Sequence, residues 1–66
     1  MRYQFIVQGR VSDAVAEDLP EMTCTSYPTG GTSLHGPVRD EADISSVLAR
    51  IHDHGLSVVE FRSLPD

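Results

Sequence analysis

The chain has 66 residues and a formal net charge of −5, because ten acidic residues face five arginines and no lysine. This length allows one small domain, residues 1–66, which buries only about 60% of the surface that its unfolded chain exposes. Nucleic-acid-binding domains carry a basic footprint, so the acidic balance argues against DNA or RNA as a partner and against an anionic membrane surface.

The N-terminus lacks the apolar core and cleavage site of a signal peptide, and no run approaches the roughly 18 apolar residues of a membrane span. The only cysteine, Cys24, rules out an intrachain disulfide and suits a reducing compartment. The sequence therefore predicts a cytoplasmic protein without a membrane partner.

Residues 3–11, YQFIVQGRV, alternate between apolar and polar side chains. A period of two with aromatic and β-branched residues is typical of a half-buried strand. The odd-numbered side, with Phe5 and Val7, is predicted to face the core, and the even-numbered side, with Gln4 and Ile6, to face away from it.

The next segment, SDAVAEDLP, predicts a short helix. Ser12 or Asp13 can cap its start, Val15 and Leu19 share one face, and Pro20 ends the pattern. The alternative is an irregular loop within a ββαβ core. Four acidic residues are predicted to form a solvated face here: Asp13, Glu17, Asp18 and Glu21.

The segment MTCTSY predicts a strand of modest strength, and the glycine-rich YPTGGTSLHG follows it. A phosphate loop needs a lysine after its second glycine and then a helix. Here Gly30 and Gly31 are followed by Thr32 and by an alternating, strand-like segment that ends at Gly36-Pro37. PTGGT therefore predicts a hairpin connection in which glycine supplies positive φ angles.

Residues 39–56, RDEADISSVLARIHDHGL, predict a second helix. Asp40 is a good N-cap, and Gly55 suits the position after the C-cap, where Leu56 and Ile51 would make the contact of a Schellman motif. One apolar stripe follows the i, i+3, i+4, i+7 spacing: Ile44, Val47, Leu48 and Ile51.

The segment LSVVEFRSL predicts a closing strand, with Val59 and Phe61 on one side and Val58, Glu60 and Arg62 on the other. The order β-α-β-β-α-β predicts a ferredoxin-like α+β fold, which is a four-stranded antiparallel sheet with both helices on one face. Right-handed crossovers place the first and third strands in the centre.

The stretch LHGPVRDEADISSVLARIHDHGLSVVEFRSL resembles the C-terminal half of a family of small uncharacterised actinobacterial proteins, with a pattern near L-x-G-P-V-x-D followed by R-I-x-x-L-G-L. The matching positions are Leu34, Gly36, Pro37, Val38, Asp40, Ala42, Leu48, Arg50, Ile51, Gly55, Leu56 and Arg62. Ile44 and His54 depart from the expected leucines, and His54 leaves a polar gap near the helix end. The family implies no activity. By fold alone the chain is also similar to ACT regulatory modules, and fold does not imply function.

The face of the sheet without helices is the predicted binding surface. Its candidate residues are Gln4, Ile6, Gln8, Ser33, His35, Val58, Glu60 and Arg62. Small size and exposed β-branched side chains favour a second copy stacked on this face, or a ligand lying across it. Pairing through an edge strand is the other route to a homodimer, and the sequence does not decide between face and edge.

His35 is the titratable residue with the clearest catalytic potential, since a histidine beside a carboxylate can act as a general acid or base. An enzyme would use His35 with Glu60 or Arg62, in a pocket built between two subunits. The alternative role is an ordinary cross-strand hydrogen bond.

Neither a metal site nor a cofactor is expected. His52 and His54 are two residues apart, whereas helical metal pairs are usually four apart, so a site with His35, His52 and Asp53 is not favoured. Both histidines suit the negative end of a helix dipole. Cys24 has no nearby helix N-terminus or cation to activate it and is predicted to be a half-buried strand residue.

Together these observations predict a non-catalytic, dimeric module that binds a small metabolite or another protein through the open face of its sheet. Two alternatives stay open. One is an accessory protein that contacts a larger partner through the acidic helix, and the other is a small enzyme with an intersubunit site around His35.

Overall fold

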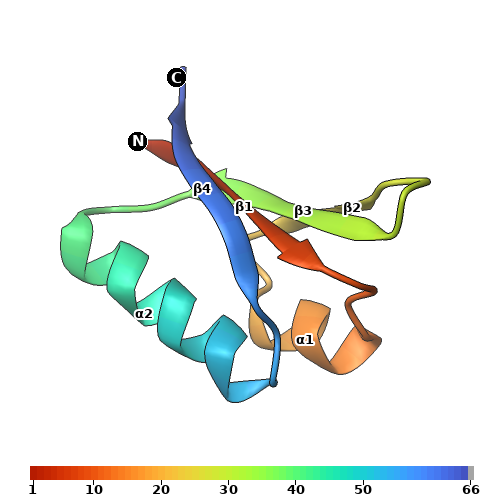
Figure 1. Ribbon diagram of the computed structural model, residues 1–66. Helices are drawn as coiled ribbons and strands as arrows, with labels where there is room; N and C mark the ends of the chain where they lie inside the picture. Colours follow the sequence, from red (N-terminus) through yellow and green to blue (C-terminus); the bar gives the residue numbers. More distant parts are fainter. Residues whose placement is uncertain (66) are drawn as a thin grey trace.

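A computed structural model describes residues 1–65, and its elements follow one another in the predicted order (Figure 1). The elements are β1 (Arg2–Gln8), α1 (Asp13–Asp18), β2 (Thr23–Ser26), β3 (Gly31–Pro37), α2 (Glu41–Asp53) and β4 (Val58–Leu64). The β-α-β-β-α-β order of the α+β fold is thus confirmed. The segment after β1 is helical, which removes the ββαβ alternative with an irregular loop.

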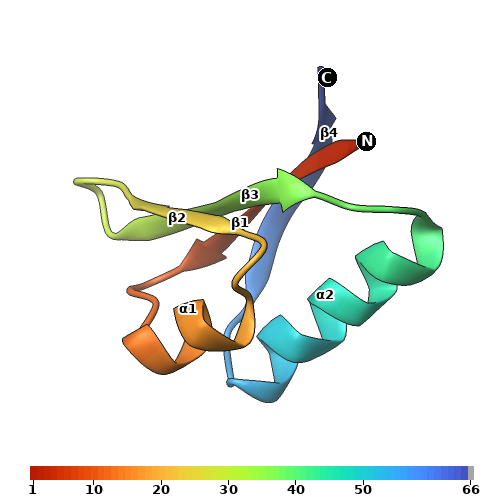
Figure 2. The same ribbon diagram turned by 180° about the vertical axis from the view of Figure 1, so that it is seen from behind.

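The four strands form one sheet in the order β2-β3-β1-β4, and every neighbouring pair is antiparallel. The first and third strands are central, as the right-handed crossovers predict. Both helices lie on one side of the sheet, and the opposite face carries no element (Figures 1 and 2). The fold therefore leaves the open face and the outer edges of β2 and β4 uncovered.

The hydrophobic core lies between the sheet and the two helices. Phe5, Val7 and Leu34 contribute from the sheet and are fully buried. The helices and loops contribute Val15, Leu19, Met22, Val38, Ile44, Val47 and Ile51. The alternation in β1 and the apolar stripe of α2 thus face the core as predicted, with Leu48 packed at its border.

Helix α2 begins and ends at the predicted residues. Asp40 is the N-cap, and its Oδ1 accepts a hydrogen bond of 2.8 Å from the backbone N–H of Asp43. At the other end Gly55 has a φ of +77°. The backbone N–H of Leu56 donates to the carbonyl of Ile51 at 3.4 Å, which is the long bond of a Schellman motif.

The glycine-rich stretch is the connection of the β2–β3 hairpin. The backbone N–H of Tyr27 donates to the carbonyl of Gly31 at 2.8 Å, and the N–H of Gly30 donates to the carbonyl of Tyr27 at 3.0 Å. Gly30 has a φ of +100°, a backbone conformation that glycine adopts without steric cost. The hairpin prediction is confirmed, and no helix follows that could complete a phosphate loop.

Strand β4 departs from the predicted alternation. Ile6 lies opposite Glu60, but the next residue, Val7, lies opposite Val58, so a β-bulge inserts Val59 between the two pairs. Val58 consequently packs against the core from the helix side of the sheet. The prediction that placed Val58 on the open face is wrong, because a simple period of two cannot register an inserted residue.

Candidate functional site

The open face is organised around Gln4 in the central strand β1. The Gln4 side chain donates from Nε2 to Ser33 Oγ of β3 at 2.9 Å and accepts at Oε1 from Arg62 Nε of β4 at 3.0 Å. The same Nε2 lies 3.5 Å from the hydroxyl of Tyr27. One amide therefore links three strands and the start of the hairpin connection in a single polar row.

The bond between Gln4 and Ser33 is partly buried, whereas the contacts of Gln4 with Arg62 and Tyr27 are exposed. Ser33 is only 2% exposed, so its hydroxyl needs a hydrogen-bond partner, which Gln4 supplies. Arg62 uses its Nε for Gln4, which leaves its two terminal Nη groups for another acceptor. Ile6 follows on the same face of β1 and is half-buried.

The predicted catalytic group is not assembled within the chain. His35 lies on β3 opposite Gln4, whereas Glu60 lies on β4 opposite Ile6, so β1 separates them. Within residues 1–65 no hydrogen bond or ion pair joins His35 to Glu60 or to Arg62. His35 therefore neighbours Gln4, as predicted, but it does not neighbour Glu60.

Two further positions complete the placement of the predicted residues. Gln8 is exposed at the end of β1, opposite Gly31, and stands apart from the polar row. Val58 lies on the opposite side of the sheet. The structure thus brings together six of the candidates on one face, and these are Gln4, Ile6, Ser33, His35, Glu60 and Arg62.

Sequence reasoning missed three residues on this face. Tyr27 reaches it from the start of the hairpin connection and continues the alternation of Thr23 and Thr25. Thr23 and Thr25 lie opposite His35 and Ser33, so their side chains share the open face. Alternation within MTCTSY was the signal that could have placed both threonines.

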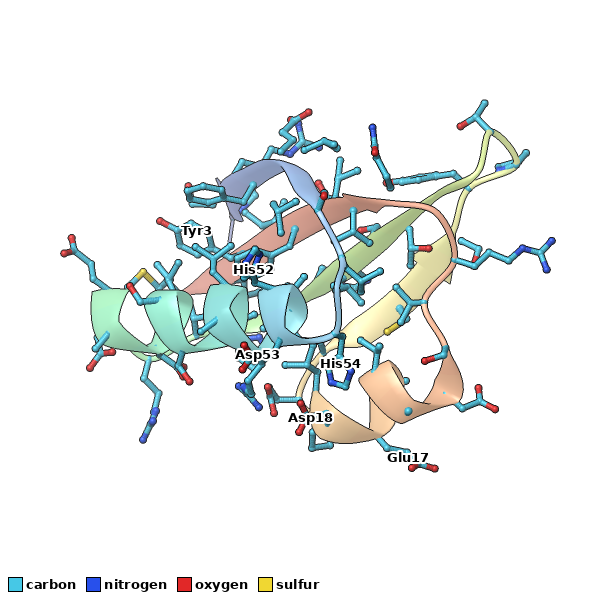
Figure 3. All side chains as sticks on the ribbon, turned by 60° about the horizontal axis from the view of Figure 1, so that its bottom comes forward. Tyr3, Glu17, Asp18, His52, Asp53 and His54 are labelled. Atoms are coloured by element: carbon cyan, nitrogen blue, oxygen red, sulfur yellow. The ribbon has the colours of Figure 1, made fainter. Side chains whose placement is uncertain are left out.

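The other two histidines point away from each other (Figure 3). His52 lies on the side of α2 toward Tyr3, and His54 Nε2 lies 3.0 Å from Asp18 Oδ2 of α1. This arrangement agrees with the two-residue spacing, and residues 1–65 hold no group of three side chains that could bind a metal ion. The polar gap at His54 is thus filled by a polar contact between the helices.

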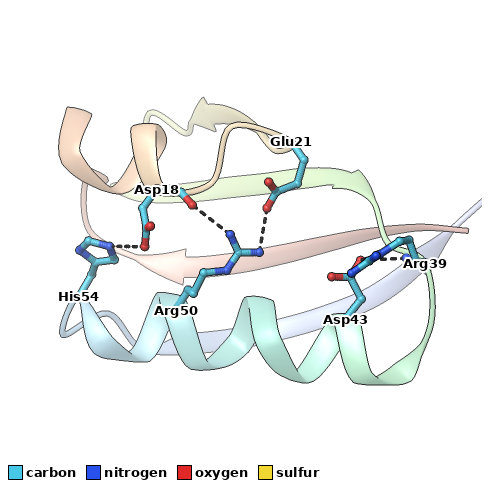
Figure 4. Close-up of polar contacts among 6 residues, drawn as sticks. All are labelled: Asp18, Glu21, Arg39, Asp43, Arg50 and His54. Atoms are coloured by element: carbon cyan, nitrogen blue, oxygen red, sulfur yellow. Dashed lines mark hydrogen bonds and ion pairs between the residues drawn. The ribbon is translucent and has the colours of Figure 1, made fainter.

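Polar contacts join the loop after α1 to α2 (Figure 4). Arg50 donates from Nη1 to the carbonyl oxygen of Asp18 at 3.0 Å and from Nη2 to Glu21 Oε1 at 2.9 Å. Asp18 and Glu21 therefore contact α2 and nevertheless stay exposed, as predicted. Asp13 and Glu17 are exposed, as predicted.

Cys24 is exposed on β2, so the prediction of a half-buried residue is wrong. Its strand lies at the sheet edge, where all four residues are exposed. Desolvation by its surroundings nevertheless raises the pKa of the Cys24 thiol above its ordinary value. Little thiolate forms near neutral pH, which argues against a nucleophilic role.

Comparison with known families gives one match, to a family described as a domain of unknown function (DUF8691), and it spans residues 2–62. The chain belongs to this family. The match covers every element from β1 to α2 and β4 as far as Arg62, so the expectation of an uncharacterised family is confirmed for nearly the whole chain. No curated protein and no solved structure matches the chain. Among residues 1–65 of this DUF8691 domain, no helix is long and apolar enough to cross a membrane.

Proposed function

We propose that this DUF8691 domain is a non-catalytic, dimeric module that binds a small metabolite or an extended segment of another protein through its open sheet face. The observation that carries the proposal is the polar row of Arg62, Gln4 and Ser33 across three strands. Gln4 and Ser33 are held by their partly buried hydrogen bond, so a ligand does not have to pay again for ordering these two side chains.

The surroundings of the row indicate the chemistry of the ligand. Tyr27, His35 and the terminal groups of Arg62 can donate hydrogen bonds beside the half-buried Ile6. Such a mixed surface suits a ligand that carries carbonyl or carboxylate oxygens on an apolar frame. Three hollows on the described chain do not include Gln4, Ile6, His35 or Arg62 in their walls. A face with its polar residues outside such hollows favours an extended ligand, or one enclosed by a second subunit.

The two alternatives have less support. An enzyme around His35 would need a carboxylate near the imidazole, and the nearest candidate, Glu60, lies across β1. An accessory protein that docks through the acidic helix would have fewer free charges than the sequence implies, since Asp18 and Glu21 already bind α2. A regulatory role like that of ACT modules would be one form of the proposed function, on the basis of the fold alone.

A binding screen with two matched variants tests the proposal. Free amino acids, common nucleotides and short peptides serve as probes, with thermal shift for detection and amide chemical shifts for mapping. Gln4→Leu removes both hydrogen bonds of the row, whereas Gln8→Leu makes the same change on the same strand outside it. We expect Gln4→Leu to weaken binding of a mapped probe about tenfold, the loss of one to two hydrogen bonds, while Gln8→Leu leaves it unchanged.

The map of perturbed amides decides the outcome. Perturbations centred on Gln4, Ser33 and His35 support the proposal. A probe that binds with wild-type affinity to Gln4→Leu and perturbs α1 or α2 instead would contradict it.

A further inference from the structure

We propose that β4 pairs antiparallel with β4 of a second copy, centred on Phe61, so that two four-stranded sheets join into one continuous sheet. The inference rests on one part of the proposed function, which is that the chain forms a dimer. It does not depend on whether the open face binds a ligand. It assigns the interface to a strand edge and fixes its register.

The outer edge of β4 is the natural place for such pairing. Strand β4 ends the sheet order and has seven residues, whereas the other edge strand, β2, has four. An unpaired edge offers backbone donors and acceptors to another strand, and natural monomers shorten it, cover it, or block it with charges and bulges. Strand β4 has a bulge at Val59 and two charged residues, but it also exposes Val59 and Phe61, which are 54% and 51% exposed.

The charges on β4 are self-complementary about Phe61. Glu60 precedes Phe61 and Arg62 follows it. When Phe61 lies opposite the partner's Phe61, Glu60 lies opposite the partner's Arg62, and symmetry creates the same pair a second time. In this register the regular ladder runs outward from Phe61 through Glu60 and Arg62 of each strand and ends at the bulge around Val59, because Val58 and the partner's Leu64 lie on opposite faces.

Neighbouring registers are disfavoured by the same charges. A two-fold axis through Glu60 would place it opposite the partner's Glu60, and an axis through Arg62 would place it opposite the partner's Arg62. Like charges directly opposite one another destabilise a strand pair. The charges of β4 therefore favour an axis through Phe61 over the two axes next to it.

Both charged side chains are available for this contact. Glu60 and Arg62 are exposed on the open face, and Glu60 makes no hydrogen bond or ion pair within residues 1–65. Arg62 uses only Nε for Gln4, so an Nη group can donate to the partner's Glu60 without breaking the polar row. The pairing would thus extend that row across the two-fold axis.

The helix side of β4 supplies the apolar part of the interface. The Phe61 ring stands 6.1 Å from Phe5 and 6.5 Å from Tyr3, centroid to centroid, at the open flank of the core. A groove of about 540 Å³ lies between the C-terminal half of α2 and the start of β4. Its walls are formed by Leu48, Ala49, His52, Leu56, Ser57 and Val58. The partner's Phe61 would cover this flank.

The area required is modest for a chain of this size. The smallest specific interfaces bury about 600 Å² per subunit, and the whole chain exposes 4243 Å². A seven-residue strand, an exposed aromatic ring and the groove beside them offer the kind of surface that such an interface needs.

Charge reversal with mixing tests the inference. Light scattering over a concentration series should give wild type a mass of twice the 7.2 kDa of one chain. Glu60→Arg and Arg62→Glu each place like charges opposite one another twice per dimer, so each alone should raise the dimer dissociation constant about tenfold or more. An equimolar mixture of the two variants pairs opposite charges again and should restore dimers of wild-type affinity.

A folded-state control and a face variant complete the design. Far-UV circular dichroism shows whether each variant keeps its fold, and His35→Glu places a charge on the open face, separated from β4 by β1. Loss of dimer in both single variants with recovery in the mixture supports the inference. Reversed variants that stay dimeric while His35→Glu becomes monomeric would overturn it and leave a dimer through the open face. A wild-type monomer at every concentration would overturn both this inference and the dimer in the proposed function.

Discussion

At the scale of single residues, Gly36 shows most directly how the sequence determines packing. An added Cβ at this position would meet the carbonyl oxygen of Glu21 at 2.5 Å and the Met22 sulfur at 3.0 Å. The loop after α1 therefore packs directly on the β3 backbone. Glycine is needed here for close approach rather than for an unusual backbone angle.

Gly36→Ala should accordingly destabilise the chain by about 1–3 kcal/mol, the usual cost of an overpacked core position. Urea unfolding measures the change. Gly31→Ala is the control, because its Cβ would meet only ordinary contacts, at 3.4 Å from the Val7 carbonyl oxygen and 3.7 Å from Tyr27. Equal losses for the two variants would contradict the close contact at Gly36.

Cys24 should react slowly despite its exposed position. Its raised pKa lowers the thiolate fraction at any given pH, and the thiolate is the reactive form. We expect iodoacetamide to alkylate the folded chain several-fold more slowly at pH 7.5 than the same chain unfolded in urea. The rate for the folded chain should keep rising with pH after that of the unfolded chain has levelled off. Equal rates at every pH would contradict the raised pKa.

Which side chains lie on the open face could largely be predicted from the alternation of residues along each strand. Alternation along β1 places Gln4 and Ile6 together, and alternation in the other strands adds Ser33 and Arg62. Alternation in MTCTSY also puts Tyr27 on the side of Thr23 and Thr25, but it does not show that the Tyr27 hydroxyl reaches Gln4 of β1, because that contact depends on the order of the strands.

At the scale of elements, α2 is the part that local sequence determines best. A capping aspartate, an apolar stripe and a C-terminal glycine each act within a few residues, so their effects are visible in the chain itself. The contacts of α2 with α1 are different. Arg50 and His54 bind Asp18 and Glu21, which are some thirty positions away in sequence, and no periodic pattern predicts such pairs.

Arg50 should therefore contribute more to the free energy of unfolding than Arg39, which also has a carboxylate neighbour. Arg50→Leu removes hydrogen bonds to a backbone carbonyl and to Glu21, and we expect a loss of about 1–2 kcal/mol. Arg39→Leu removes a contact of 3.7 Å to Asp43 from a side chain that is 88% exposed, so about 0–0.5 kcal/mol is expected. Urea unfolding compares the two. An Arg39 effect as large as that of Arg50 would contradict the role of Arg50 in joining the helices.

At the scale of the whole molecule, the topology follows from the order of elements. With two crossovers of fixed handedness, β1 and β3 can only take the centre, and the strand order β2-β3-β1-β4 confirms this. The association of two chains lies beyond such rules. The proposed association depends on the charges of Glu60 and Arg62 on either side of Phe61. These charges point to strand pairing only once β4 is known to be an edge strand.

If the chain associates as proposed, its thermal stability should depend on its own concentration. Association stabilises the folded state by mass action, and a domain of this length has a small unfolding entropy. We expect the midpoint of thermal unfolding to rise by about 3–5 °C for each tenfold increase in concentration near the dimer dissociation constant. Glu60→Arg should reduce this slope. A midpoint that is independent of concentration would argue for a monomer.

The bulge in β4 also bears on which changes in chain length the fold can absorb. Val58 and Glu60 already oppose consecutive residues of β1, so removing Val59 would leave Val58 and Glu60 adjacent in a regular ladder with every other pair intact. Deletion of a residue from Glu60 onward would instead move the side chains on one side of the deletion to the opposite face of the sheet. The strand could avoid this only if Val59 entered the regular ladder and the bulge disappeared. Deletion of Val59 would therefore shorten β4 by one residue without moving any of its other side chains to the opposite face of the sheet.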